Sequence, residues 1–196
     1  MDEATEDHRT PDELAAGTVA IAASPVGAGR LELIVRRPRI GEREVVDTAQ
    51  LDVAIGLVGD TWADRPSTRT PDRSPHPGMQ LNMMNARAIE LIAGSRARWP
   101  LAGDQLFVDL HLGPAELPPG TRLRVGEAVI EVTDVPHRGC AKFTRRFGLA
   151  AMRFVNSEVG TRLNVRGVNA KVVVTGTIRT GDEISALPPA ATRPCR

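Results

Sequence analysis

The chain has 196 residues, of which 41% are hydrophobic and 3% aromatic, with no tyrosine. That length suits one domain with a small appendage, whose core has to be built from Val, Ile, Leu and Ala. The 25 basic and 24 acidic residues nearly cancel, so composition gives no general attraction to nucleic acid or to an anionic membrane. The chain starts with acidic residues and shows no signal sequence, no apolar run of membrane-spanning length and only two cysteines. These features favour a reducing, cytoplasmic location.

The first half of the chain is expected to begin with a polar tail, residues 1–17, that ends in one short helix. Thr10 can cap this helix, and Gly17 can stop it. β-Branched residues with partial alternation then predict three strands, over residues 18–26, 30–38 and 42–54. Residues 56–78 are rich in Pro, Arg and Ser and are expected to form a long irregular loop, which in a compact domain is usually functional or disordered.

The second half alternates strand and helix signals without a regular βα repeat. We expect a helix capped by Asn85, then a strand over 104–112 and a hairpin over 118–135 that turns at Gly126 and Glu127. A helical stretch over 149–165, broken near Asn156, is expected to follow. The chain is then expected to form a strand pair over 169–184 and to end in a C-terminal tail, residues 185–196. About eight strands and few helices predict a mostly β fold. We expect residues 18–184 to form a closed or nearly closed antiparallel β-barrel with two or three flanking helices.

Cys140, the one cysteine in the body of the chain, lies in a segment that contains several cations and no carboxylate from residue 135 to 148. Such cations lower the pKa of a thiol from about 8.5 and so favour the thiolate, which is the nucleophile and the metal ligand. Gly139 is expected to let another molecule approach the backbone beside the sulfur. The basic neighbours in this segment are His137, Arg138, Lys142, Arg145 and Arg146.

Two plainer interpretations of Cys140 stay open. An unpaired cysteine is often a small buried hydrophobe without chemical function. His137 and Cys140 also form half of a zinc site, but the other candidates, His76, His111 and Cys195, are scattered and supply no second close pair.

The loop over residues 56–78 is a second cationic element. Guanidinium groups bind phosphate in a bidentate manner, so this loop could close over a phosphate, although it could equally be a mobile, solvated loop. Its basic side chains are Arg65, Arg69, Arg73 and His76. Arg166 and Asn169 stand at the entrance of a predicted strand, where they could cap the backbone or hydrogen-bond a heterocycle.

Four segments together resemble the MOSC domain, which is named after the C-terminal part of eukaryotic molybdenum cofactor sulfurase. They are "GLVGD", "GDQL", the stretch "LPPGTRLRVGEAVIEVTDVPHRGCAKFTRRFG" and the closing "LNVRGVNAKVVVTGTIRTGD". The resemblance covers residues 17–182. It implies a strand-rich barrel that binds the pterin-based molybdenum cofactor, molybdopterin, or takes part in its sulfuration.

The resemblance also implies roles for particular residues. Cys140 would carry a persulfide or ligate molybdenum, with His137 as a second catalytic candidate beside it. Asp60 and Asp104 match the acidic positions of the family signatures. The phosphate of the cofactor would be held by Arg138, Lys142, Arg145 and the arginines of the 56–78 loop.

This chain departs from the family at Trp62, where many members have a histidine, and at "GDQL", where many have "GENL". It lacks the pyridoxal-phosphate domain of fused sulfurases, so pyridoxal phosphate is not expected. It also lacks the extra barrel of the amidoxime reductases, so a reductase activity would need redox partner proteins.

Three functions stay open from the sequence. The chain could be an enzyme, either a molybdenum-dependent reductase of N-hydroxylated compounds or a sulfurtransferase supplied by a cysteine desulfurase. It could be a carrier that stores or delivers cofactor or sulfur, or a barrel in which Cys140 is only packing. Neither nucleic acid nor a membrane is an expected partner, and the oligomeric state is open.

Overall fold

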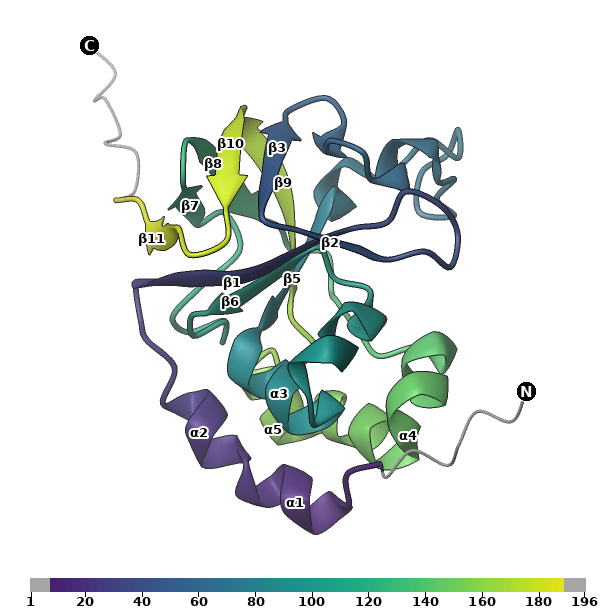
Figure 1. Cartoon of the computed structure of the whole chain (residues 1–196), viewed down its shortest axis with the longest axis vertical. Coiled ribbons are helices and arrows are strands. Elements are labelled where there is room, and N and C mark those ends of the chain that lie inside the picture. The colour runs from purple at the N-terminus through teal and green to yellow at the C-terminus, as the bar shows by residue number, and fades with distance from the viewer. Residues whose placement is uncertain (1–7, 189–196) are drawn as a thin grey trace.

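The computed structural model describes residues 8–188 and shows a β-barrel with helices gathered along one side (Figure 1). Within this range, seven strands close the barrel, since the last of them pairs with the first. The predicted closed barrel is therefore confirmed, but it is mixed, because β5 and β6 run parallel. In spatial order the strands are β1 (Ala28–Arg36), β6 (Leu106–Asp109), β5 (Leu81–Asn85), β9 (Val168–Val174), β8 (Ala128–Val132), β7 (Arg122–Val125) and β11 (Glu183–Ala186).

The remaining strands extend the barrel or form a small second sheet. The two-residue turn at Gly126 and Glu127 joins β7 to β8 as predicted, and Gly126 has a φ of 52° there. The C-terminal strand pair was predicted with the wrong partners, because β10 pairs with β3 and β9 pairs with β8 and β5. The additional strands are β2 (Glu44–Val46), which pairs with β1, and β3 (Thr48–Asp52), β4 (Gly56–Leu57) and β10 (Gly176–Arg179) of the second sheet.

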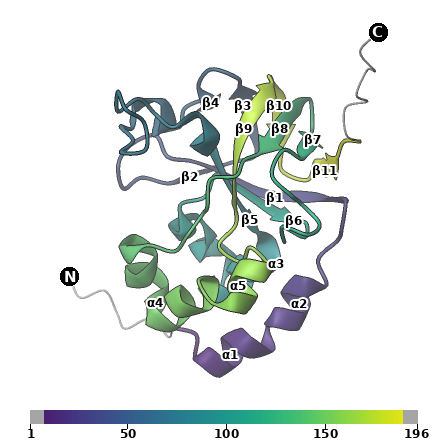
Figure 2. The same cartoon turned by 180° about the vertical axis from the view of Figure 1, so that it is seen from behind.

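Residues 8–188 contain five α-helices, where two or three were expected (Figure 2). No helix in this range is both long and apolar enough to cross a membrane. The α-helices are α1 (Pro11–Ala16), α2 (Thr18–Ala22), α3 (Ala86–Ala93), α4 (Ala141–Val155) and α5 (Glu158–Arg162), and the 3₁₀ helices are η1 (Thr61–Asp64), η2 (Pro77–Met79) and η3 (Arg96–Ala102).

The strand predicted over residues 18–26 was wrong, because its first part forms α2. Leu14 and Ile21 are seven residues apart, and both are buried in the helix layer, as expected for one face of a continuing helical path. Val19 would share a strand face with Ile21 but is 76% exposed. The capping box at Thr10 and Glu13 is present as predicted, and Gly17 ends α1 in a helical conformation, so the chain resumes a helix at once.

The two faces of the strands divide the buried residues into two cores, and an irregularity in the β1–β6 pairing between Leu31 and Leu33 puts these two residues on opposite faces. On β1, Leu31 and Ile34 point into the barrel, whereas Leu33 and Val35 face the helices. Phe107 on β6 likewise belongs to the helix-facing core. The strands that carry both cores therefore hold the helices at a fixed place on the barrel wall.

The helix α4 begins eight residues earlier than predicted and contains a break. Gly148 has a φ of 84° and a ψ of 168°, which separates the segment after Cys140 from the stretch predicted to be helical. The one break that was predicted, near Asn156, is confirmed, since Asn156 ends α4 and Ser157 caps α5 by accepting a hydrogen bond from the Gly160 amide. The break at Gly148 thus gives the basic segment around Cys140 a short helix of its own.

Candidate functional site

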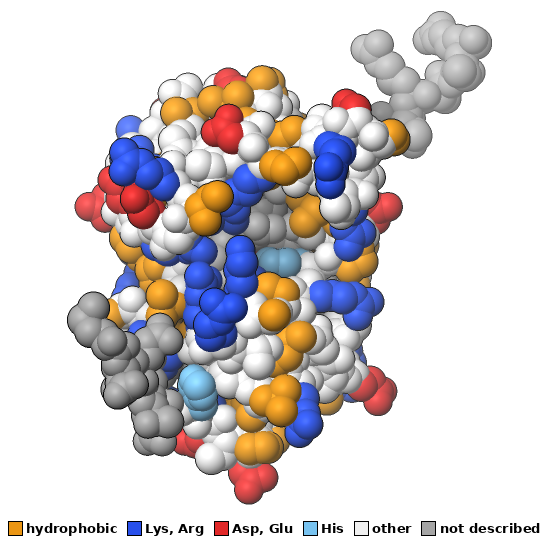
Figure 3. Space-filling model, turned by 90° about the vertical axis from the view of Figure 1, so that its right-hand side faces the viewer, with side chains coloured by type: hydrophobic (Ala, Val, Ile, Leu, Met, Phe, Trp, Pro, Cys, Tyr) orange, Lys and Arg blue, Asp and Glu red, His pale blue; other side chains and the backbone are white. Residues whose placement is uncertain are grey.

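Basic side chains gather around a hollow on one face of the molecule, and a histidine ring is visible inside it (Figure 3). We call this the arginine hollow, a cavity of about 330 Å³ on the side of the barrel that carries the β1–β2 connection and the long loop predicted over 56–78. No carboxylate is among the residues that line it. They are Arg37, Trp62, Arg65, Pro66, Ser67, Thr68, Arg69, His76, Met79 and Asn82.

A buried ion pair fixes the wall of the arginine hollow. The Arg37 guanidinium donates Nε to Asp60 Oδ2 at 2.7 Å and Nη2 to Asp60 Oδ1 at 2.8 Å, and both side chains are under 8% exposed. Asp60 also accepts from the backbone amides of Arg37 and Trp62, at 2.9 Å each. Its oxygens are thereby occupied, so Asp60 orients Arg37 and caps η1 and has no free edge for a ligand.

A chain of amide side chains connects the hollow to the loop that carries Cys140. Arg37 Nη1 donates to Asn82 Oδ1 at 3.3 Å, and Asn82 Nδ2 donates to Asn169 Oδ1 at 2.5 Å. Asn169 Nδ2 in turn donates to the Val135 carbonyl at 2.9 Å, at the start of the loop before Cys140. Asn169 is fully buried, so it contributes to the site through these hydrogen bonds.

Asp104, Arg166 and His137 form a second buried cluster. Arg166 Nη1 donates to Asp104 Oδ2 at 2.7 Å, and the Arg166 guanidinium lies 5.0 Å from the Phe143 ring centroid on α4. His137 Nδ1 lies 3.5 Å from Asp104 Oδ1, and neither atom has a hydrogen-bond partner. Burial, together with the Arg166 charge, lowers the pKa of His137 from 6.5 to about 3, against a smaller opposing effect of Asp104, so the imidazole is neutral near pH 7.

Three further guanidinium groups converge on this face without a carboxylate partner among the described residues. Burial and the charges of Arg146, Arg37 and Arg65 lower the pKa of Arg43 from 12.5 to about 10. Burial and the Arg37 charge also lower the pKa of Arg65. Arg65 bonds to the Thr61 hydroxyl and Arg146 to the Leu101 carbonyl, both neutral acceptors, and Arg43 Nε is buried and unpartnered.

These arginines therefore repel one another across a partly buried space. An anion placed among them would remove that repulsion and would supply acceptors for the unpartnered N–H groups. The residues present thus fit a phosphate-bearing ligand.

Cys140 is exposed and unpaired, and it is the N-cap residue of α4. It does not line the arginine hollow. The expectation for Gly139 was wrong: a Cβ there would lie 2.5 Å from Met152 Sδ and 2.9 Å from Val155 Cγ2. The missing side chain therefore lets the loop pack against α4, so the space beside Gly139 is filled by this protein's own side chains.

The other predicted site residues are spread over this face. Arg65 and Arg69 line the hollow, whereas Arg73, with a φ of 61°, does not. Arg138 lines a separate cavity of about 70 Å³ together with His137 and Arg166. Lys142 and Arg145 are exposed on α4, and Cys195 lies outside the described residues. Among residues 8–188, no three His, Cys, Asp or Glu side chains are grouped closely enough to hold a metal ion.

Sequence reasoning missed Arg37, Arg43 and Asn82, and it noted Trp62 and Arg146 without assigning them to the site. The stretch "RRPRIGER", residues 36–43, carried a usable signal, since it contains four arginines in eight residues. Asn82 lies on β5, a strand that was not predicted, so nothing in the local pattern marked its side chain.

Comparisons with known proteins agree with the barrel fold. The family model of the MOSC domain matches residues 77–185. The YuaD protein from Bacillus subtilis has a similar structure, with a TM-score of 0.61 at 17% identity over 83% of this chain and 97% of that one. The YiiM proteins from Escherichia coli and Geobacillus stearothermophilus give TM-scores of 0.53 and 0.55, at 18% and 12% identity, over 82% and 84% of this chain and 71% and 77% of theirs.

No curated protein matches this sequence. The solved structures are too distant in sequence to support more than a shared fold. The family model covers more than half of the chain, from η2 to β11, and includes Asp104, Cys140 and Arg166. The chain therefore belongs to the MOSC domain family.

Proposed function

We propose that this protein binds the molybdenum cofactor, with the cofactor phosphate in the arginine hollow and Cys140 as the ligand or sulfur-bearing residue. The observation that carries the proposal is a set of guanidinium groups without a carboxylate partner among the described residues: Arg65 in the lining of the hollow, and Arg43 and Arg146 beside it. Burial and the charges of the neighbouring arginines lower the pKa of Arg43 to about 10, and a bound phosphate would relieve the repulsion.

Each group in the site has a distinct task under this proposal. Arg43, Arg65 and Arg146 would bind the phosphate, since their charges are not committed to carboxylates of the described residues. Asp60 would position Arg37, which already donates to Asn82. These buried contacts would hold the donors in place before the ligand arrives, which lowers the cost of binding.

Trp62 would supply a flat apolar surface in the same hollow. It lies among the lining residues beside the cations, and aromatic side chains commonly stack on heterocyclic ligands. A pterin is such a heterocycle. Asp104 and Arg166 are buried outside the lining of the hollow, and they would hold the neutral His137 beside the Cys140 loop.

The cofactor, when bound, would supply two-electron redox chemistry at molybdenum, and N-hydroxylated compounds are the substrate class that the family suggests. Electrons would have to come from separate redox partner proteins. Such a function fits a reducing compartment such as the cytoplasm, where Cys140 would remain a free thiol.

A second candidate function is favoured by the exposure of Cys140. A thiol at the surface, outside the hollow, is accessible to another protein. A cysteine desulfurase could transfer its sulfane sulfur to the Cys140 thiolate, which would leave a persulfide here and a free thiol on the donor. The protein would then be a carrier, with no substrate turned over.

Tryptophan fluorescence tests the cofactor proposal directly. The chain has two tryptophans, and Trp99 is only 4% exposed and donates to Glu90 in the helix layer. Metal-free molybdopterin should quench Trp62 alone. Trp62→Phe should abolish the quenching, and Trp99→Phe should retain it. Arg65→Gln should weaken binding about 10- to 100-fold, the value of a hydrogen bond between a charged donor and phosphate. Unchanged fluorescence over the whole titration would refute phosphate–pterin binding in the hollow.

Turnover separates the two candidates. Reduction of a hydroxylamine by the cofactor-loaded protein with an artificial electron donor, lost in Cys140→Ser, would establish the enzyme. A persulfide on Cys140 after incubation with a cysteine desulfurase, detected as a mass increase of one sulfur atom in the absence of such turnover, would establish the carrier.

A further inference from the structure

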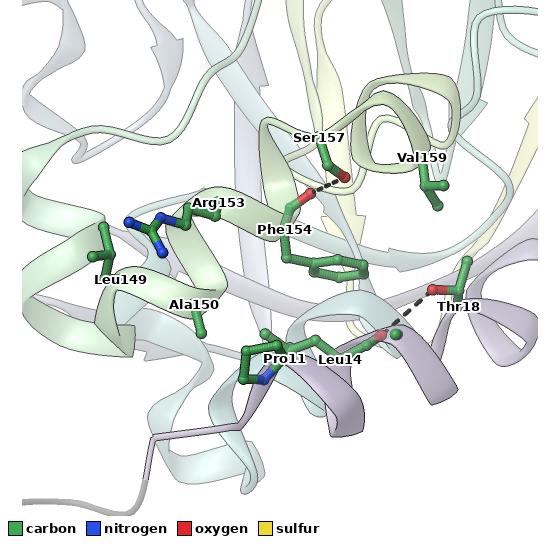
Figure 4. Close-up of a pocket in the computed structure, with 10 residues that line it drawn as sticks. Pro11, Leu14, Thr18, Leu149, Ala150, Arg153, Phe154, Ser157 and Val159 are labelled. Atoms are coloured by element: carbon green, nitrogen blue, oxygen red, sulfur yellow. Dashed lines mark hydrogen bonds between the residues drawn. The ribbon is translucent and has the colours of Figure 1, made fainter.

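A second cavity lies on the helical side of the molecule, between α1–α2 and α4–α5, and it has a volume of about 690 Å³ (Figure 4). This is within the range of cavities that hold small organic ligands. None of its residues lines the arginine hollow. Its lining includes Leu14, Thr18, Ala150, Arg153, Phe154 and Ser157.

The body of this cavity is apolar. The two hydroxyl groups in its wall are already occupied, since Thr18 donates to the Leu14 carbonyl and Ser157 donates to the Phe154 carbonyl at 2.7 Å. The Phe154 ring lies between the α1 side of the cavity and Val159 (Figure 4). A ligand seated here therefore meets mostly hydrocarbon.

One charge stands at one end of the cavity. Arg153 lies beside Leu149, one helical turn apart on α4, whereas Thr18 and Val159 lie at the other end (Figure 4). Arg153 is the only charged residue of the lining and is exposed, and no hydrogen bond or ion pair of the described residues involves its side chain. Leu149 next to it is 54% exposed, so apolar surface continues up to the cation.

A cavity with an apolar body and one unpartnered cation at its end is complementary to an amphiphile with a single negative head group. We propose that this cavity binds a medium- or long-chain alkyl carboxylate, with the chain along Phe154 and Leu14 and the carboxylate at Arg153. The site is independent of the cofactor proposal, since the two sites share no residue.

Calorimetric titration with a series of saturated carboxylates from six to twelve carbons tests the proposal, each kept below its micelle-forming concentration. Every added methylene that enters the cavity should tighten binding about fourfold, from about 0.8 kcal/mol per buried CH₂. Arg153→Gln should weaken decanoate binding about fivefold, the value of an exposed ion pair of about 1 kcal/mol, and should leave decanol binding unchanged. Arg162→Gln, an exposed arginine on α5 outside the cavity, is the matched control.

Ala150→Phe provides a second test, because its larger side chain would fill the cavity and should abolish binding of decanoate and decanol alike. Its melting temperature shows whether the fold is retained, and Arg153→Gln, at an exposed position, gives a result even if Ala150→Phe does not fold. Three results would each overturn the proposal: no decanoate binding to the wild-type protein, an affinity independent of chain length, or equal decanoate affinity in wild type and Arg153→Gln.

Discussion

The neutral state of His137 predicts a measurable loss of stability in acid. In the folded protein its pKa is about 3, whereas an unfolded chain returns it to 6.5. Between these two values the unfolded state binds more protons than the folded state, so the free energy of unfolding falls as pH falls below 6.5. Between pH 7 and pH 5 this linkage for one group amounts to about 2 kcal/mol.

The perturbation that isolates this effect is His137→Gln, which cannot take up the proton. Urea unfolding followed by tryptophan fluorescence at pH 7 and pH 5 gives the loss of stability for each protein. The wild type should lose about 2 kcal/mol more than His137→Gln, whatever the cost of the substitution itself, because that cost is common to both pH values. His111→Gln keeps His137 and should show the wild-type loss. Equal losses in wild type and His137→Gln would refute a buried, neutral histidine beside Asp104.

Two further predictions concern the frame of the site. Asp60→Asn should lower the free energy of unfolding by about 3–5 kcal/mol, because it leaves the buried charge of Arg37 unpaired. Asp64→Asn, at an exposed position of η1, is the control and should change the stability little. Chemical denaturation of both variants measures the difference, and an Asp60→Asn protein as stable as wild type would contradict the Arg37–Asp60 pair. Gly139→Ala should lower the free energy of unfolding by about 1–3 kcal/mol, because the new Cβ would lie 2.5 Å from Met152 Sδ. The thermal midpoint should recover in part when Met152→Ala is added. A Gly139→Ala protein as stable as wild type would show that the loop does not pack on α4 in this way.

The fold was predictable where a local signal agreed with the final structure. The Gly126 turn, the Asn85 cap and the break at Asn156 each depend on one residue's conformational preference, and each lies where expected. Strand β5 was missed because "LNMMN" has neither β-branched residues nor clean alternation; its place is set by neighbours far away in sequence, β6 and β9. Residues 18–22 were misread because Val19 and Ile21 match a strand, while only the burial of Ile21 with Leu14 reveals the helix.

The basic character of the site could be predicted from the sequence, whereas its contacts could not. The excess of basic residues over 56–78 and 135–148 indicated a basic surface, and Arg65 and Arg69 of the first segment line the hollow. No sequence pattern showed that Asp60 and Asp104 would be buried under Arg37 and Arg166, because these ion pairs join residues 23 and 62 positions apart. Cys140 directly follows Gly139, which packs against Met152 and Val155 of α4, and local composition does not encode this contact or the exposure of Cys140.

The most direct test of the central claim is the amount of pterin and molybdenum per chain in protein produced without oxygen in a host that makes the cofactor. Wild type, Cys140→Ser and the double variant Arg43→Gln/Arg65→Gln should be compared at equal purity. We predict about one pterin and one molybdenum per wild-type chain, loss of both in the arginine variant, and loss of molybdenum in Cys140→Ser. A wild-type protein without pterin, or an arginine variant that retains as much as the wild type, would contradict the claim that the arginine hollow holds the cofactor.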